Sequence, residues 1–460
     1  MTSPLRPYQQ AAIDKVLSTP APHAQLLAHP MASGKTRTAI ELIKRLQPQR
    51  TLVVTPALVR PAWQRQFAQW APELEVGLIA HGRKARNLTK AQVAERDAAF
   101  QSSIQIVSYQ LLKETEDTGW DMVVVDEAHR LRNPISAQSK LVRNRCRLNL
   151  GAHVLLMTGT IIPSEVRQIW NPVDMVQPGW YGLPQRNGKE PWRFLQTFCH
   201  RVETEYGVDF RGFNKDKEVY LKGLLSPWMH EVSEDEVAPF LPPLYVEPLH
   251  IDDGKEDLAI VEDWLEDVTA EVTHVSIHCH LNDTRKRVVA HLQGQRIPVI
   301  EIDATAHDAQ SRDMLLLKAK ELPRAILVST THALNEGISL SFIKAGLVLE
   351  WTSDMAGVMQ FIRRFARQDA ATQMPTYLQF VVRPEDENKA TTLSRRVADK
   401  NAVLLSGKTD TFVTNFTTSC VYSDTELEAM AAAAFQSYTD KSEFEDGDDD
   451  DSDSQNSAEN

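Results

Sequence analysis

The chain has 460 residues, enough for two or three domains, and its 42% hydrophobic and 24% charged content is that of a globular protein. No stretch approaches the roughly 18 consecutive apolar residues of a membrane span, and the first residues lack the basic and apolar regions of a secretion signal. The cysteines are widely spaced and form no CxxC pair, which disfavours a disulfide framework or a zinc ribbon and indicates a reducing compartment.

The formal net charge of −12 is unevenly distributed. Ten acidic residues and one lysine between Asp440 and Asn460 carry most of it, so the rest of the chain is close to neutral. We expect residues 441–460 to form a disordered acidic tail, because such a segment is too polar and self-repelling to fold. A near-neutral body also predicts only modest non-specific affinity for nucleic acid, since Lys and Arg supply most of that affinity.

Short apolar runs alternate with amphipathic segments in the first 160 residues. The runs are β-branched or leucine-rich without strict polar alternation, which is typical of strands buried on both faces of a parallel sheet. The predicted strands are 25–28, 51–54, 104–107, 122–125 and 153–157. Strand and helix in alternation predict an α/β doubly wound layer.

The pattern breaks between about 178 and 228, which we interpret as a partly helical insertion, and the prolines of 241–244 resemble a stiff connector. From about residue 273 the alternation resumes. The predicted strands there are 275–277, 299–302, 325–328, 347–349 and 377–382, and the predicted helices are 386–400 and 424–438. We therefore expect an α/β fold with two lobes, 1–245 and 246–440.

Residues 29–36 follow a predicted strand and open a predicted helix. A loop whose N–H groups turn inward at a helix N-terminus can cradle phosphate oxygens. Lys35 would then reach the β and γ phosphates of a nucleotide, and the Thr36 hydroxyl would bind Mg²⁺. The flanking strand and helix disfavour a chance Gly-Lys-Thr turn, so we interpret Ser33, Gly34, Lys35 and Thr36 as nucleotide-binding residues.

Four apolar residues lead directly into the run Asp126-Glu127-Ala128-His129. An Asp at the carboxyl end of a buried strand lies at the crevice where α/β sheets bind ligands, and there it can hold Mg²⁺. Glu127 can orient and polarise an attacking water, and phosphoryl transfer needs mainly positioning, a metal and charge stabilisation. The apolar run disfavours an ordinary exposed acidic pair.

Residues 360–367 contain a third basic motif. Arg364 and Arg367 are three apart, so on a helix they would share a face. From a second lobe they could stabilise charge on the γ-phosphate as arginine fingers. The alternative is an ordinary basic helix face, and the second α/β lobe favours the fingers.

In chain order these motifs resemble those of the Swi/Snf-like ATPases of helicase superfamily 2, over roughly residues 5 to 400. Residues 5–9 resemble the adenine-reading motif, and 126–134 resemble the extended DEAH-type motif II, which is the most specific match. The segments that resemble motifs Ia, Ic and III are 52–56, 106–109 and 156–160. The resemblance implies two RecA-like lobes with a nucleotide cleft between them, and ATP and Mg²⁺ as cofactors.

The resemblance also implies roles for single residues. Those that would bind the adenine end are Arg6 and Gln9. Those that would couple hydrolysis to lobe movement are His129, Thr158, Gly159, Thr160 and Gln360. Those that would contact nucleic-acid phosphates are Thr55, Ser108, Ser329 and Thr330, and such contacts position a duplex without reading its sequence.

Departures from the family pattern lie mostly in the second lobe. Ala32 replaces a glycine of the phosphate loop, 335–340 lack the paired glycines of motif V, and 278–280 lack the usual aromatic residue and Gln of motif IV. These departures are compatible with ATP hydrolysis, which we still expect, whereas the mode of DNA tracking stays open. A metal site at His274, His278, Cys279 and His280 is disfavoured, because successive strand side chains alternate faces and no partner stands at a ligand spacing.

We expect a monomeric, DNA-stimulated ATPase that translocates on duplex DNA, of the compact kind that bacteria and phages carry. It would act in the cytoplasm of a bacterial cell or phage-infected host, or in the nucleus of a eukaryote. One alternative is a helicase that migrates branched DNA or remodels forks in recombination or repair. A non-motor alternative is an ATP-switched interaction protein whose acidic tail binds a basic, DNA-binding partner. The simplest interpretation of the tail is a solubilising end. It could instead compete with DNA for the basic groove, and the sequence does not decide between these interpretations.

Overall fold

The computed structural model describes residues 4–389, with gaps at 150, 160–164, 206, 252–253, 271, 295–297, 304–305, 308, 335–338, 353–354, 367–373 and 387. The acidic tail, the helix predicted at 424–438 and most of the one predicted at 386–400 lie outside the described residues. Among the described residues, no helix combines the length and apolar character that crossing a bilayer requires.

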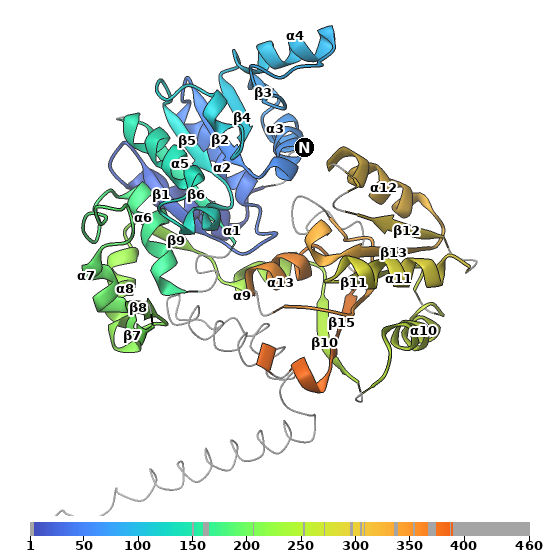
Figure 1. Ribbon diagram of the computed structural model, residues 1–460. Helices are drawn as coiled ribbons and strands as arrows, with labels where there is room; N and C mark the ends of the chain where they lie inside the picture. Colours follow the sequence, from blue (N-terminus) through green and yellow to red (C-terminus); the bar gives the residue numbers. More distant parts are fainter. Residues whose placement is uncertain are drawn as a thin grey trace, which may run out of the picture.

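The first lobe is built on a sheet of seven strands in the order β3-β4-β2-β5-β6-β1-β9 (Figure 1). Its strands are β1 (Ala24–Ala28), β2 (Thr51–Thr55), β3 (Val76–Leu78), β4 (Ile104–Ser108), β5 (Met122–Val125), β6 (His153–Thr158) and β9 (Met229–Glu231). All neighbouring strands are parallel. All the predicted strands are present, and only β3 and β9 are added, each too short at three residues to carry a periodic pattern.

Both faces of this sheet are buried, as the apolar runs predict. Successive residues of β5 point to opposite faces: Val124 packs in a core with α1, α2 and α3, and Val125 in a core with α5 to α8. These helices are α1 (Pro7–Ser18), α2 (Lys35–Leu46), α3 (Arg60–Trp70), α5 (Ala137–Leu148), α6 (Trp170–Val176), α7 (Trp192–Phe198) and α8 (Glu218–Leu225). Helix α4 (Lys90–Ala99) projects from the edge of the lobe near β3 (Figure 1).

The insertion between β6 and β9 contains more than the helices expected there. An antiparallel hairpin of β7 (His200–Thr204) and β8 (Gly207–Arg211) separates α7 from α8. Its residues are mostly exposed, so no apolar run announces it in the sequence. Short helical turns complete this lobe and the connection onward: η1 (Ala57–Val59), η2 (Leu112–Glu114), η3 (Ala128–Arg132), η4 (Val166–Ile169), η5 (Lys215–Lys217), α9 (Glu234–Val237) and η6 (Ala238–Phe240).

The second lobe holds a six-stranded parallel sheet in the order β10-β15-β14-β11-β13-β12. Its strands are β10 (Leu244–His250), β11 (His274–Cys279), β12 (Val299–Ile302), β13 (Ala325–Thr330), β14 (Ala345–Val348) and β15 (Thr376–Val382). The edge strand β10 is not predicted, because Glu247, Pro248 and His250 interrupt its apolar pattern; within sheets, proline is found mainly on edge strands such as this one. It begins at Leu244, two residues before the predicted start of lobe 2.

Helices cover both faces of this sheet as well (Figure 1). One apolar core joins α10 and α11 to β11, and another joins α12 and α13 to β12. The helical elements are α10 (Asp257–Val268), α11 (Asn282–Leu292), α12 (Ala309–Glu321), η7 (Thr331–Leu334), α13 (Met355–Ile362) and η8 (Pro384–Asp386). The predicted architecture of two doubly wound, parallel-sheet lobes is therefore confirmed.

Candidate active site

The candidate site lies at the carboxyl ends of the strands of the first sheet. It contains the phosphate loop, the Asp126-Glu127 pair and Thr158. β5, β6 and β1 are neighbours and parallel, so their carboxyl ends meet there. The loop follows β1, Asp126 follows β5, and Thr158 ends β6. This edge is where parallel α/β sheets bind ligands.

The phosphate loop has the left-handed backbone of an anion-binding turn. Gly34 has φ 81° and ψ 32° immediately before α2, and Ala32 has φ 61°. Left-handed residues turn successive N–H groups towards one point, beside the positive end of the helix. The Lys35 ammonium, buried in the loop, donates to the carbonyl oxygens of His29 and Pro30, both at 3.0 Å.

Side chains of helix α1 donate hydrogen bonds to the backbone of this loop. Gln9 is buried; its Nε2 donates to the carbonyls of Ser33 and Gly34 at 3.2 and 3.3 Å, and its Oε1 accepts from Arg6 N at 3.0 Å. The Tyr8 hydroxyl donates to the same Ser33 carbonyl at 3.0 Å, a contact that the sequence does not predict. Gln9 thus has a loop-holding role in addition to its expected adenine contact, which stays a prediction.

Arg6 packs on a different neighbour. Its guanidinium lies 4.3 Å from the centre of the Phe240 ring and donates to the Phe240 carbonyl at 3.4 Å. Phe240 in turn packs edge-on against Tyr8, 5.9 Å between ring centres. Arg6 therefore lies near the loop, while its predicted nucleotide contact remains untested.

Asp126 is buried, and three donors hold its carboxylate. Oδ2 accepts from Trp63 Nε1 at 2.9 Å and from Thr55 Oγ1 at 3.3 Å, and Oδ1 accepts from Glu127 N at 3.0 Å. The indole of Trp63, fully buried on α3, is a site residue whose role the sequence does not reveal. Burial, and then the charge of Glu127, raise the pKa of Asp126 to about 6, against the hydrogen bond from Trp63 and the charge of Lys35.

The pKa of Glu127 shifts in the opposite direction. Burial alone would raise its pKa, but the hydrogen bond and charge of His129, followed by the charges of Lys35 and Arg364, outweigh burial and lower the pKa of Glu127. His129 Nδ1 lies 3.2 Å from Glu127 Oε2. The pair therefore favours an ionised Glu127 beside an Asp126 that resists ionisation.

His129 joins the two lobes. Its Nδ1 lies 3.4 Å from Thr158 Oγ1, and its Nε2 lies 3.4 Å from Nε2 of Gln360 on α13 of the second lobe. The structure thus brings together His129, Thr158 and Gln360, which the sequence assigns to coupling.

The arginine motif needs one correction. Helix α13 ends at Ile362, and Arg364 follows it in a turn, where its N–H donates to the Phe361 carbonyl at 2.9 Å. The helical spacing invoked for Arg364 and Arg367 therefore does not apply. Arg364 is nevertheless buried and close enough to lower the pKa of Glu127. Arg367, like Thr160, lies outside the described residues.

Gly159 is where motif III meets the phosphate loop. A Cβ built on it would lie 2.8 Å from Met31 Cγ, closer than side chains tolerate, and 3.6 Å from Lys35 Nζ. Because Gly159 has no side chain, the end of β6 can lie directly against the phosphate loop and Lys35.

A family model described as the SNF2-related domain matches residues 8–256, more than half of the chain. The chain belongs to the SNF2-related family. This confirms the resemblance to Swi/Snf-like ATPases of superfamily 2 inferred from the motifs.

Several relatives of this SNF2-related chain are known. YwqA of Bacillus subtilis, named for ATP-dependent helicase/translocase activity, is 23% identical over 362 residues, 75% of this chain and 36% of that protein. The ISWI chromatin-remodeling complex ATPase ISW2 of Saccharomyces cerevisiae is 28% identical over 191 residues, 39% of this chain and 16% of that protein. The chain thus spans only a minor part of these relatives. The solved SWI2/SNF2 ATPase core of Sulfolobus solfataricus with double-stranded DNA aligns at a TM-score of 0.42 and 18% identity, over 91% of this chain and 96% of that one.

The hydroxyls predicted to contact phosphates are buried and bonded inside their lobes. Thr55 Oγ1 donates to Asp126 as described. Ser108 Oγ accepts from Leu111 N at 3.3 Å, and Thr330 Oγ1 from Ala333 N at 3.3 Å. Ser329 Oγ lies 2.9 Å from Nδ1 of His278. Thr55 would have to release Asp126 to donate to a phosphate, whereas Ser108 and Thr330 act as acceptors in these bonds, and a hydroxyl can accept and donate at once. The nucleic-acid contacts of these hydroxyls stay predictions.

His278 is a core residue of the second lobe. Its second ring nitrogen lies 2.8 Å from Ser276 Oγ, and its ring packs edge-on against Phe361 at 4.6 Å. Burial lowers the pKa of His278 to about 3, so the ring is neutral.

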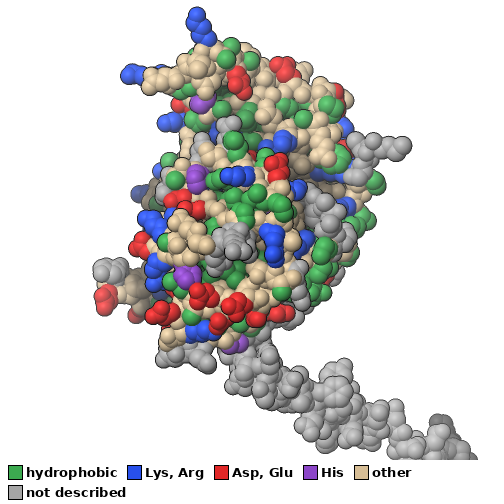
Figure 2. Space-filling model, turned by 90° about the vertical axis from the view of Figure 1, so that its right-hand side faces the viewer, with side chains coloured by type: hydrophobic (Ala, Val, Ile, Leu, Met, Phe, Trp, Pro, Cys, Tyr) green, Lys and Arg blue, Asp and Glu red, His purple; other side chains and the backbone are tan. Residues whose placement is uncertain are grey.

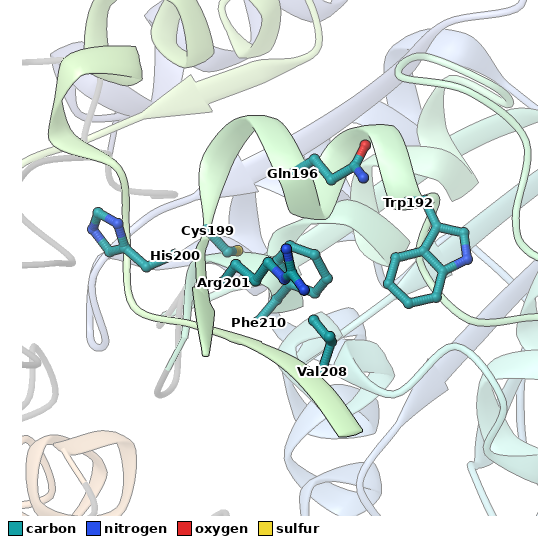
Figure 3. A pocket seen from close by; sticks show the side chains of 7 residues that line it. All are labelled: Trp192, Gln196, Cys199, His200, Arg201, Val208 and Phe210. Carbon is teal, nitrogen blue, oxygen red and sulfur yellow. The ribbon is translucent and has the colours of Figure 1, made fainter. Parts of the chain in front are cut away.

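A separate hollow of about 490 Å³ lies in the insertion, between α7 and the β7–β8 hairpin (Figure 3). The half-exposed Trp192 and the buried Phe210 pack edge-on at its wall, 5.6 Å between ring centres. The Cys199 thiol also lines it, and burial raises the pKa of Cys199 to about 12, which favours the protonated thiol.

Proposed function

We propose that the chain hydrolyses ATP and uses the energy to move along duplex DNA. The observation that supports this most directly is the gathering of Lys35, Asp126 and Glu127 at one sheet edge, with Arg364 of the other lobe beside Glu127. Nucleotide hydrolysis requires a phosphate-binding loop, a metal ligand, a residue that orients water and a cation that stabilises the transition state. Each has a candidate here.

The residues present fit the substrate and its metal. Gly34 and the start of α2 offer inward-facing N–H groups, and the buried Ser33 hydroxyl has no hydrogen-bond partner among the described residues. Two neighbouring carboxylates repel each other in a buried position, and a divalent cation would relieve that repulsion. Thr36 and Asp126 would hold magnesium, which supplies charge neutralisation at the phosphates.

The chain's own residues then divide the work. Lys35 exchanges the loop carbonyls for phosphate oxygens. Glu127, whose lowered pKa keeps it ionised, orients a water for attack, and His129 fixes its carboxylate. Arg364 stabilises charge from the second lobe, so hydrolysis depends on how the lobes are placed. Movement of the second lobe therefore follows the state of the nucleotide.

Family membership supports DNA as the track. YwqA is named as a helicase/translocase, and the human relative "DNA excision repair protein ERCC-6", 28% identical over 136 residues, is named for repair. The surface charge of the second lobe limits where DNA can bind. Helix α10 exposes four acidic residues: Glu262, Asp263, Glu266 and Asp267. Acidic side chains also gather in the lower part of the face shown in Figure 2. Phosphates are repelled there, so we place the duplex across the lobes on another side.

The test is the steady-state ATPase rate of the purified chain, measured with duplex DNA, single-stranded DNA, a four-way junction and RNA at one salt concentration. We expect duplex DNA to give the largest stimulation. A larger stimulation by the junction would favour the branch-migration alternative. Equal rates with and without every nucleic acid would contradict a DNA motor.

A further inference from the structure

Tyr109 connects the turn after β4 to the backbone of the catalytic pair. It is 1% exposed, and its hydroxyl donates to the carbonyl of Asp126 at 2.7 Å, with the carbonyl of Glu127 at 3.4 Å. Burial, followed by the nearby charge of Asp126, raises the pKa of Tyr109 far above its usual value. The phenol is therefore a permanent donor.

The backbone that receives this hydrogen bond is strained. Glu127 has φ 53° and ψ 49°, a left-handed conformation that is unfavourable for a residue with a side chain. Such a conformation persists only where its surroundings impose it. Two contacts meet here: the Asp126 carboxylate accepts from Glu127 N at 3.0 Å, and Tyr109 fixes the carbonyl of the same peptide group.

The geometry points to Tyr109 as a positioning residue for ATP hydrolysis: by holding the peptide between Asp126 and Glu127, its hydroxyl sets the direction of the Glu127 carboxylate. This inference rests on the proposed function. The backbone torsions of Glu127 decide in which direction its side chain leaves the backbone, and a misplacement of about 1 Å can slow a reaction about a hundredfold. No contact of Tyr109 with substrate is required.

The same residue offers a path from nucleic acid to the catalytic centre. Ser108, the last residue of β4, precedes Tyr109 directly, and its hydroxyl closes the turn to Leu111. A duplex that displaces this turn shifts the Tyr109 ring and with it the peptide of Glu127. Stimulation by DNA should therefore pass in part through this hydroxyl.

The experiment uses Tyr109→Phe in the full chain, which keeps the buried ring and removes only the hydroxyl. The matched control is Tyr181→Phe, because Tyr181 is also buried and its hydroxyl donates to Thr197 Oγ1 at 3.0 Å, but in the insertion. We measure kcat and KM for ATP with and without duplex DNA, and the melting temperature of each protein.

We expect Tyr109→Phe to lower the DNA-stimulated kcat by about tenfold to a hundredfold, the range for a misplaced catalytic group. KM for ATP should stay within about twofold, and the ratio of stimulated to basal rate should fall. Tyr181→Phe should match the unsubstituted protein in both constants.

Other results overturn the inference. Equal kcat in Tyr109→Phe and the unsubstituted protein excludes a positioning role. Tyr109→Phe could instead raise KM and lower the melting temperature while Tyr181→Phe does neither. That result would mean that the Tyr109 hydroxyl stabilises the fold rather than positioning the catalytic carboxylate. An unsubstituted chain that hydrolyses no ATP overturns the proposed function itself, and this inference with it.

Discussion

Asp126 is predicted to reduce the stability of the nucleotide-free protein. Its carboxylate is buried beside Glu127, and its pKa rises from 3.8 to about 6. A folded-state pKa above the unfolded value means that folding disfavours the charged form. The penalty is fully present above about pH 6 and disappears as the pH falls below the unfolded pKa.

The size of the effect follows from the structure. A shift of about two pKa units corresponds to at most about 3 kcal/mol. Asp126→Asn removes the charge, but the amide has a single acceptor oxygen where the carboxylate serves Trp63, Thr55 and the Glu127 N–H. One lost hydrogen bond costs about 1 kcal/mol. We therefore expect Asp126→Asn to be more stable by about 1–2 kcal/mol at pH 7.5, and to lose ATPase activity.

Urea unfolding in EDTA, followed by tryptophan fluorescence at pH 7.5 and pH 4.5, measures this difference. The control is Asp174→Asn: Asp174 is equally buried, but its carboxylate pairs with Arg147 at 2.6 Å, so the substitution should destabilise. A variant Asp126→Asn that is less stable at pH 7.5, or a gain of the same size at both pH values, would refute the reasoning.

Three further predictions concern the loop and the lobe contact. Gly159→Ala should raise KM for ATP about tenfold, because its Cβ would meet Met31 Cγ at 2.8 Å. Adding Met31→Ala should restore KM, and a failure to restore it would contradict the steric explanation. Ala32→Gly should raise the melting temperature, because it removes up to about 1 kcal/mol of left-handed backbone strain at φ 61°. An unchanged or lower melting temperature would show that the packing lost with the Ala32 methyl group outweighs the strain. Gln360→Ala removes the contact with His129 and should reduce stimulation by DNA while mant-ATP binding is unchanged; undiminished stimulation would argue against this coupling route.

The fold was largely predictable because its strands are buried on both faces. Runs such as 122–125 are continuous in apolar residues, and the structure places them in the middle of the sheet, as such runs require. The hairpin β7–β8 and the edge strand β10 escape prediction for the opposite reason. Their side chains are mostly exposed or partly exposed, so burial imposes no pattern on the sequence.

The site was predictable where local sequence determines local geometry. Gly34 before a helix, and Asp126 after a strand, need no distant information. The partners of these residues come from remote segments: Trp63 and Tyr109 reach Asp126 through tertiary packing, and no spacing in the chain announces them. The same limit explains Arg364, because where α13 ends depends on packing that helical periodicity does not contain.

The central claim is that Glu127 activates water in a centre completed by the second lobe. Single-turnover hydrolysis of ATP with saturating duplex DNA tests it most directly, in the unsubstituted chain, Glu127→Gln and Arg364→Ala. We predict that both variants bind mant-ATP with nearly unchanged affinity and that hydrolysis slows by at least about a hundredfold in each. Hydrolysis at the unsubstituted rate in either variant would contradict the claim.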